Sequence, residues 1–148
     1  MMTKRGLLPL VIGVSVLILL SVWWVVLHKL QAERRVLDER FRDVKALVMV
    51  CFTATNILNT EELLAEATRQ RVVLKCPAAK DRSKPCHRMV NPWRSKIEAT
   101  QPQLLLIAET NVTDPHGLFI ANMEGSVNYF STRRIAEMLS WTNGHPSD

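Results

Sequence analysis

Two cysteines that bracket a basic loop are the residues of this 148-residue chain best placed to do chemistry. Cys76 and Cys86 are separated by nine residues, and His87 follows Cys86 directly. In an oxidising compartment a disulfide would close this loop, and the chain-entropy model gives so small a ring about 2–3 kcal/mol. Free thiols are the alternative. A metal site would recruit His87 and a ligand such as His116, but the CxxC or HxxxH spacing of zinc ligands is missing, so we expect neither a metal nor another cofactor.

Glu109, Asp114 and His116 form the one compact group of catalytic residue types near predicted turns. A hydrolase would also need a nucleophile and an orienting partner held together. Ser126 and Ser131 lack the context of a nucleophile elbow, and His116 beside a glycine is typical of a turn. We therefore expect no catalytic residues and no enzymatic activity.

An apolar run from Gly6 to Leu27 dominates the first part of the chain. Its 22 positions carry no charge, and only residues 1–5 precede it. As a helix with about 1.5 Å rise per residue it would extend roughly 33 Å, enough to cross a hydrocarbon core about 30 Å thick. Trp23 and Trp24 lie near its downstream end, where aromatic rings favour the membrane interface. We predict a single-pass transmembrane helix over residues 6–28, with the lipid bilayer as its partner.

A cleaved segment is the alternative to a plain anchor. A secretory signal has a shorter apolar region and a small-residue cleavage site, which this run lacks. Residues 1–5 form a short basic segment, and Arg5-Gly6 followed by Leu7 has the layout of a prepilin leader. Gly6 and Leu7 are thus a candidate leader-peptidase site.

The charges around the run leave its orientation open. Lys4 and Arg5 precede it, and a larger number of basic residues follows within a few turns. The positive-inside rule would then place the C-terminal part in the cytoplasm, although acids are interleaved with these charges. A second basic segment, from Arg69 to Lys96, contains nine Lys or Arg and a single acid. Because Trp93 is its one aromatic residue, we expect no nucleic-acid partner.

The helix is predicted to continue beyond the membrane. No Pro or Gly occurs between Lys29 and Thr68, so one helix extends to about Asn56 within an amphipathic extension over residues 29–58. From Ala46 to Phe52 it is apolar all round, which indicates burial against a head and makes Cys51 a core residue. Coiled-coil pairing is the alternative. Apolar residues recur along it in two seven-residue series, Leu30, Leu37, Val44, Cys51 and Leu58, and Phe41 and Val48.

Residues 59–148 are predicted to form a small α+β head. Asn59 and Glu62 form a capping-box-like start to a helix over residues 60–69. A final helix is expected from Thr132 to about Trp141, and Glu124-Gly125-Ser126 reads as a hairpin turn. The predicted strands are residues 72–74, 104–108, 118–121 and 127–130, with an irregular loop over residues 77–92. The fold class is α+β: a long N-terminal helix and a small antiparallel sheet.

Four short stretches of the head, taken in order, resemble the motifs of one family. They are Leu74-Lys75-Cys76-Pro77, Met89-Val90-Asn91-Pro92-Trp93, residues 101–109 ending at Glu109, and His116-Gly117 followed by residues 121–130. On these residues the chain resembles the pseudopilin-like proteins that carry a prepilin-type processing-associated His-x9-Asp-Gly domain. The matching family-motif residues are Cys76, Pro77, Asn91, Pro92, Glu109, His116, Glu124 and Gly125.

The resemblance implies a pilin-like fold and a structural role connected with type II secretion or type IV pili. It also implies a bacterial inner-membrane location with a periplasmic C-terminal domain, and pilin-like partners that meet it through the transmembrane helix. Leu7 and Val11 stand where a prepilin start has Phe and Glu, so we expect filament assembly to be weakened or lost. The alternative is an accessory subunit of a membrane complex, docked through the same helix.

Overall fold

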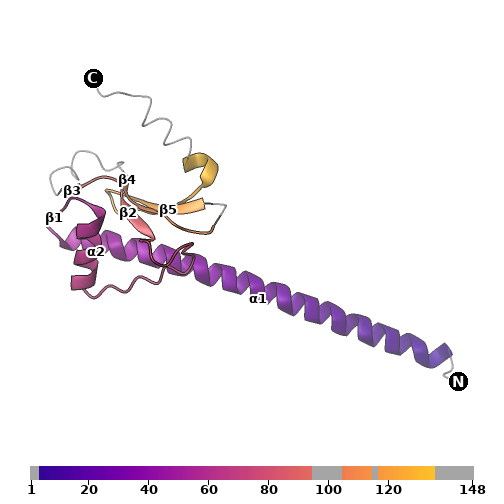
Figure 1. Ribbon diagram of the computed structural model, residues 1–148. Coiled ribbons are helices and arrows are strands. Elements are labelled where there is room, and N and C mark those ends of the chain that lie inside the picture. Colours follow the sequence, from indigo (N-terminus) through magenta and orange to yellow (C-terminus); the bar gives the residue numbers. More distant parts are fainter. Residues whose placement is uncertain (1–3, 95–104, 115–116, 136–148) are drawn as a thin grey trace. The chain divides into compact units, whose positions relative to one another are not determined.

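The computed structural model describes residues 4–94, 105–114 and 117–135 of the chain (Figure 1). It divides into two compact units, Met1–Leu37 and Asp38–Asp148. The boundary falls within the first helix, and each unit is described by itself. The predicted α+β class is confirmed, since a long apolar helix is followed by a small antiparallel sheet.

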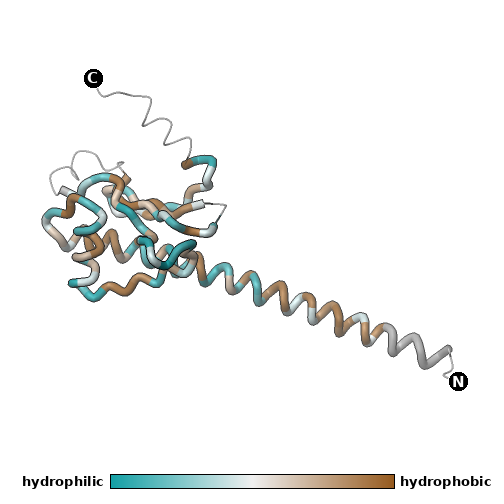
Figure 2. Tube along the Cα trace, in the orientation of Figure 1, coloured by the Kyte–Doolittle hydropathy of each residue, from teal (hydrophilic) through white to brown (hydrophobic). Residues whose placement is uncertain are grey.

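The first unit is helical. Helix α1 spans Lys4–Thr53, and its first part contains the apolar run. Side chains here are described from Ile12 onward, and they are exposed through Gln31, including Trp23 and Trp24. Figure 2 colours most residues of this stretch as hydrophobic. Within the described residues, α1 is the one helix long and apolar enough to cross a membrane.

The second unit is built on a four-stranded antiparallel sheet of order β2-β4-β5-β6. Two shorter strands, β1 (Asn56–Ile57) and β3 (Trp93–Arg94), pair separately, and α2 covers Thr60–Arg69. The sheet strands are β2 (His87–Met89), β4 (Leu105–Glu109), β5 (Gly117–Asn122) and β6 (Val127–Ser131).

Local sequence signals account for the confirmed elements. The Asn59 side chain accepts a 2.9 Å hydrogen bond from the Glu62 backbone N–H, and the Leu58 N–H donates to the Glu62 carboxylate, so the predicted capping box begins α2. Gly125 adopts φ +89° in the turn between β5 and β6, a conformation that costs glycine little. The strands predicted at residues 104–108, 118–121 and 127–130 correspond to β4, β5 and β6, with Leu104 outside the described residues.

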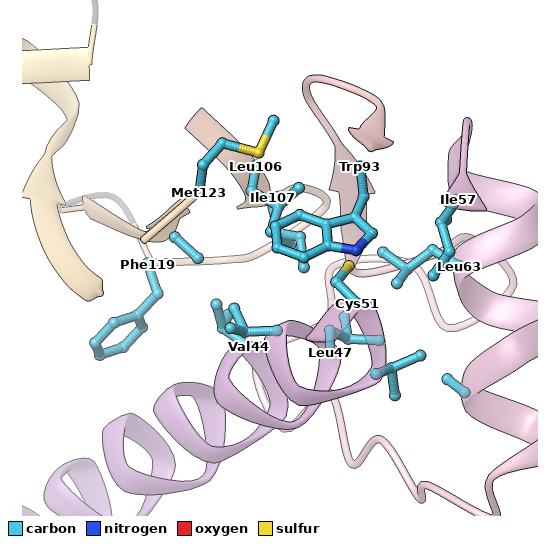
Figure 3. Packing of buried hydrophobic residues seen from close by; sticks show 14 residues of the cluster. Val44, Leu47, Cys51, Ile57, Leu63, Trp93, Leu106, Ile107, Phe119 and Met123 are labelled. Atoms are coloured by element: carbon cyan, nitrogen blue, oxygen red, sulfur yellow. The ribbon is translucent and has the colours of Figure 1, made fainter. Parts of the chain in front are cut away.

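The core forms where the last turns of α1 meet the sheet. Val44, Leu47 and Cys51 point from α1 toward Trp93 and the β4 side chains (Figure 3). A register shift between Leu105 and Ile107 is typical of a β-bulge, and both Leu106 and Ile107 are fully buried. Cys51 is also fully buried, as predicted. The core residues are Val44, Leu47, Val48, Val50, Cys51, Ile57, Leu63, Ala67, Trp93, Leu106, Ile107, Phe119, Ala121 and Met123.

Several local predictions are wrong. Residues 72–74 form no strand, and Val73 is 82% exposed, because the chain turns after α2 with the Val72 N–H bonded to the Ala67 carbonyl. The loop predicted at residues 77–92 contains β2, which is specified by pairing with β4. Helix α1 ends at Thr53, three residues before the predicted end, because Asn56 and Ile57 pair with β3.

The apolar stretch at residues 46–52 is not buried all round. Met49 is 55% exposed and Phe52 is 42% exposed, because the sheet covers only one side of the helix. The predicted final helix begins as expected at residues 132–135, and its remainder lies outside the described residues.

Candidate functional site

A buried ionic cluster joins α1 to the ends of β4 and β5. Arg40 is 2% exposed, and its guanidinium forms a bidentate contact with Glu109. Nε lies 2.9 Å from Oε1, and Nη2 lies 2.7 Å from Oε2. Nη1 donates to Asp114 Oδ2 at 2.6 Å, and Nη2 also donates to the Gly117 carbonyl at 3.1 Å. Bidentate arginine–carboxylate pairs of this kind combine strong hydrogen bonding with a fixed geometry.

The cluster lies over a row of side chains that crosses the sheet. His87 on β2 is paired with Glu109 on β4, and Phe119 on β5 is paired with Tyr129 on β6. The Phe119 N–H donates to Glu109 Oε2 at 2.7 Å and so links the two pairs. The Arg40 guanidinium is 5.4 Å from the Phe119 ring centre and 6.0 Å from that of Tyr129, within cation–π range.

The electrostatics favour a permanent ion pair. Burial acts to lower the pKa of Arg40, but the hydrogen bonds that Arg40 donates to Glu109 and Asp114, together with their negative charges, outweigh burial and raise that pKa. Burial raises the pKa of the Tyr129 hydroxyl, and so does its 2.8 Å hydrogen bond to Asp114. With its two oxygens engaged by Arg40 and a backbone N–H, Glu109 serves as a structural counter-ion, and this geometry does not suit a general acid or base.

His87 has a different environment within the same row. It is 2% exposed, and neither ring nitrogen has a hydrogen-bond partner. Burial lowers the pKa of His87, opposed by the nearby carboxylates of Glu109 and Asp43 and reinforced by Arg40. The ring is therefore neutral at pH 7, with one donor and one acceptor available.

A second polar contact lies one helical turn from Arg40. Asp43 is 3% exposed, and its Oδ2 accepts hydrogen bonds from the Lys75 N–H at 3.0 Å and the Cys76 N–H at 2.8 Å. The Lys75 ammonium pairs with Glu39 at 2.8 Å nearer the surface. Glu39, Arg40 and Asp43 thus make α1 the common anchor of the Cys76 loop and the sheet.

The two loop cysteines line one pocket of about 410 Å³. Both are free thiols in this structure, as is Cys51. Burial, together with interaction with Cys86, raises the pKa of Cys76 to about 12. Within the described residues, no three or more His, Cys, Asp or Glu side chains are arranged to hold a metal ion.

The sequence-predicted residues are only partly brought together. Glu109 and Asp114 converge on Arg40, whereas His116 lies outside the described residues. Asn91 donates from its side chain to the Leu105 carbonyl at 2.7 Å and so holds the chain after β2 against β4. Of the other motif residues, Pro77 is half-buried, Pro92 and Glu124 are exposed, and Gly125 makes the turn. Gly6 and Leu7 lie within α1.

Sequence reasoning missed Arg40 and Asp43, and it considered His87 only as a possible metal ligand. In the sequence, Arg40 is one of the basic residues that follow the apolar run, and Asp43 is one of the acids interleaved with them. The available signal was helical spacing, since Arg40 and Asp43 are four residues before the core residues Val44 and Leu47. The spacing does not identify the partner of Arg40, because Glu109 is 69 residues away in the sequence.

Comparison of the chain with protein-family models, curated proteins and solved structures finds no match. The resemblance to pseudopilin-like proteins therefore stays a prediction. The arguments that follow rest on the residues and contacts described above.

Proposed function

We propose that this chain is a non-enzymatic, single-span membrane protein with a structural, pseudopilin-like role, whose head lies outside the bacterial inner membrane. The observation that carries the proposal is the exposed apolar surface of α1. Leu19, Leu20 and Trp23 are 59–69% exposed, in a helix of membrane-spanning length. Burying such a surface in a bilayer is strongly favourable, at roughly 25 cal/mol per Å² of apolar area.

The contacts of the buried charged residues in the head support a structural role. Its buried carboxylates, Asp43 and Glu109, both accept hydrogen bonds that fix the head's own backbone or Arg40. A second pocket, of about 420 Å³ between the end of α1 and α2, contains Thr53, Thr55, Glu62 and Glu66 but no histidine or cysteine. The two buried carboxylates are thus engaged in contacts within the head, and the pocket lacks histidine, the side chain that most often serves as a general base.

Membrane extraction tests the anchor. The double variant L19R/L20R places two charges in the middle of the apolar run, at a cost of about 2.5–3.5 kcal/mol each on an insertion scale. We expect the variant to lose stable membrane integration and to appear in the alkaline-carbonate supernatant. Leu30→Arg, exposed but beyond the run, is the matched control and should remain in the membrane pellet. An unchanged distribution for L19R/L20R would overturn the proposed span.

Topology and processing test the pseudopilin-like role. Protease treatment of intact spheroplasts should digest the head, and a protected head would contradict its export. The mature N-terminus should begin at Leu7 if the chain is processed like a prepilin. An intact N-terminus at Met1 would contradict prepilin-like processing, and the helix would then be a plain membrane anchor.

A specific observation favours a second candidate, the accessory subunit of a membrane complex. Leu30 and Leu37 lie seven residues apart on α1 and are 50% and 37% exposed, outside the apolar run. In this proposal they contact the helices of larger subunits. Stoichiometric co-purification of a larger complex, lost in L30E/L37E but retained in an exposed-charge control such as R35E, would favour this candidate.

A further inference from the structure

The pocket that contains Cys76 and Cys86 combines thiols with a positively charged wall. It is lined from α2, the loop before β2 and β2 itself, and no acidic residue is among its lining residues. The lining residues are Leu64, Leu74, Lys75, Cys76, Ala79, Arg82, Lys84, Pro85, Cys86 and His87. Lys75 and Lys84 have ion-pair partners, Glu39 and Asp81, but exposed pairs of this kind are well solvated. The pocket therefore favours an anionic ligand.

The backbone holds both cysteines in fixed positions. Cys76 has φ +46°, an uncommon conformation for a residue with a side chain, and its N–H donates to buried Asp43. Non-glycine residues in such conformations cluster at functional sites. At the other end of the loop, the Cys86 carbonyl accepts a 2.7 Å hydrogen bond from the Thr110 N–H. Cys76 is thus held by α1, and Cys86 is held by the residue that follows β4. These two contacts place both ends of the loop at one wall of the pocket.

The two thiols differ in exposure. Cys86 is 6% exposed, whereas Cys76 is half-buried and within reach of a molecule in the pocket. Burial and the interaction with Cys86 raise the pKa of Cys76 and disfavour its thiolate at pH 7.

His87 forms part of the wall of the pocket that contains the two thiols. Among the described residues it is the one whose buried side-chain nitrogens lack any hydrogen-bond partner, and it lines the same pocket. Buried polar groups are nearly always hydrogen-bonded, so an unpartnered ring indicates a missing interaction. Because both ring nitrogens are fully buried, His87 contributes to the pocket wall without offering a hydrogen bond to a molecule in the pocket.

We propose that this pocket binds an anionic low-molecular-weight disulfide, which oxidises Cys76 and Cys86 to an intramolecular disulfide. Cys76 first gives up its proton, which its raised pKa makes slow at pH 7 and faster as the pH rises. Its thiolate then attacks one sulfur of the donor, and the donor S–S bond breaks to release one donor thiol, which takes up the proton that Cys76 lost. The Cys86 thiolate then attacks the Cys76 sulfur and displaces the second donor thiol, which takes up the Cys86 proton. The chain loses two electrons and two protons, and one donor disulfide becomes two thiols.

The test uses the full chain in nonionic micelles, reduced and then incubated with oxidised glutathione as the anionic probe. We expect a Cys76–Cys86 disulfide, detected after trypsin digestion as peptides joined across the cleavable residue Lys80. Cys51, fully buried in the core, should stay reduced. Closure of this ring should also raise the melting temperature by roughly 10 °C. Recovery of both loop cysteines as free thiols would overturn the proposal.

Two variants test the order of reaction. Cys86→Ser should stop at a mixed disulfide, with one glutathione retained on Cys76. Cys76→Ser should react at least about tenfold more slowly, because Cys86 is buried. Equal labelling of both variants would contradict an attack by Cys76, and circular dichroism of each variant establishes that the head remains folded.

A charge variant tests the anionic specificity. Arg82→Glu should slow oxidation by glutathione disulfide by about fivefold while leaving oxidation by the neutral hydroxyethyl disulfide unchanged. An equal effect on both donors would contradict the anionic site. This inference is independent of the proposed membrane role, because failed oxidation would leave the extraction and topology results unaffected.

Discussion

Two stretches of α1 are apolar for different reasons. Residues 12–27 present large apolar side chains that are 38–69% exposed, whereas Val44, Leu47 and Cys51 near the end of the helix are fully buried under the sheet. Composition alone does not separate these stretches. The difference is what covers the apolar side chains. The sheet of the head covers the second stretch, whereas the first is exposed and is compatible with burial in a bilayer.

Arginines of α1 also differ in exposure according to what covers them. Arg35 and Arg42 are exposed on α1, and Arg40 between them is 2% exposed because it faces Glu109. A buried pair contributes little when complete but is costly to break. The following predictions use matched positions to sharpen these contrasts.

The largest effect is expected at Arg40. Arg40→Met leaves Glu109 buried without its counter-ion, so the free energy of unfolding of the head should fall by about 3–5 kcal/mol. Urea unfolding in micelles, followed by circular dichroism, measures it. Arg42→Met is the control and should change stability by less than about 0.5 kcal/mol. Equal effects at both positions would mean that the ionic cluster does not stabilise the head.

The two apolar stretches should respond differently to the same truncation. Leu47→Ala opens a cavity in the core and should cost about 2–5 kcal/mol of head stability. Leu19→Ala, in the other unit, should leave the same urea transition unchanged. A large effect of Leu19→Ala would show that the apolar run is packed within the head and would break the comparison.

The buried imidazole should make head stability depend on pH. Burial lowers the pKa of His87 in the folded head, whereas the unfolded chain has the ordinary value near 6.5. The unfolded state therefore binds the proton more readily. The stability is fully present above pH 6.5 and falls as the pH decreases below it, by at most about 1.4 kcal/mol per unit, until the folded pKa is passed.

Substitution checks that assignment. In urea titrations between pH 7 and 5, His87→Gln should flatten the profile. His28→Gln, exposed in the first unit, should retain the wild-type slope. A slope that persists in His87→Gln would assign the dependence to another group.

The smallest effect is expected at the hairpin turn. Gly125→Ala forces a side chain onto φ +89°, and its Cβ would lie 2.8 Å from Phe52 Cε2, so we expect a loss of about 1 kcal/mol in urea unfolding. A Cβ at Gly13 would meet nothing within 4 Å. Gly13→Ala should therefore leave the head unchanged, and a similar loss in both variants would contradict the role of the turn.

The elements that could be predicted are those with local causes. The capping box at Asn59 and Glu62 begins α2 at the predicted residue, and Gly125 makes the predicted turn. The elements that were missed depend on pairing over long distances. Strands β1 and β3 join Ile57 to Trp93, and β2 is formed by pairing with β4. Short strands carry too little periodicity to be recognised without their partners.

The sequence by itself determined that α1 is a long helix with an apolar first part, that a small α+β head follows, and that Cys51 belongs to the core. These follow from periodicity, composition and caps, which act over a few residues. Only the tertiary structure decided that Arg40 and Asp43 are anchors, that His87 is buried without a partner, and that Cys76 and Cys86 share a pocket wall. Each of these depends on a burial or contact set by residues distant in the chain, which local spacing does not encode.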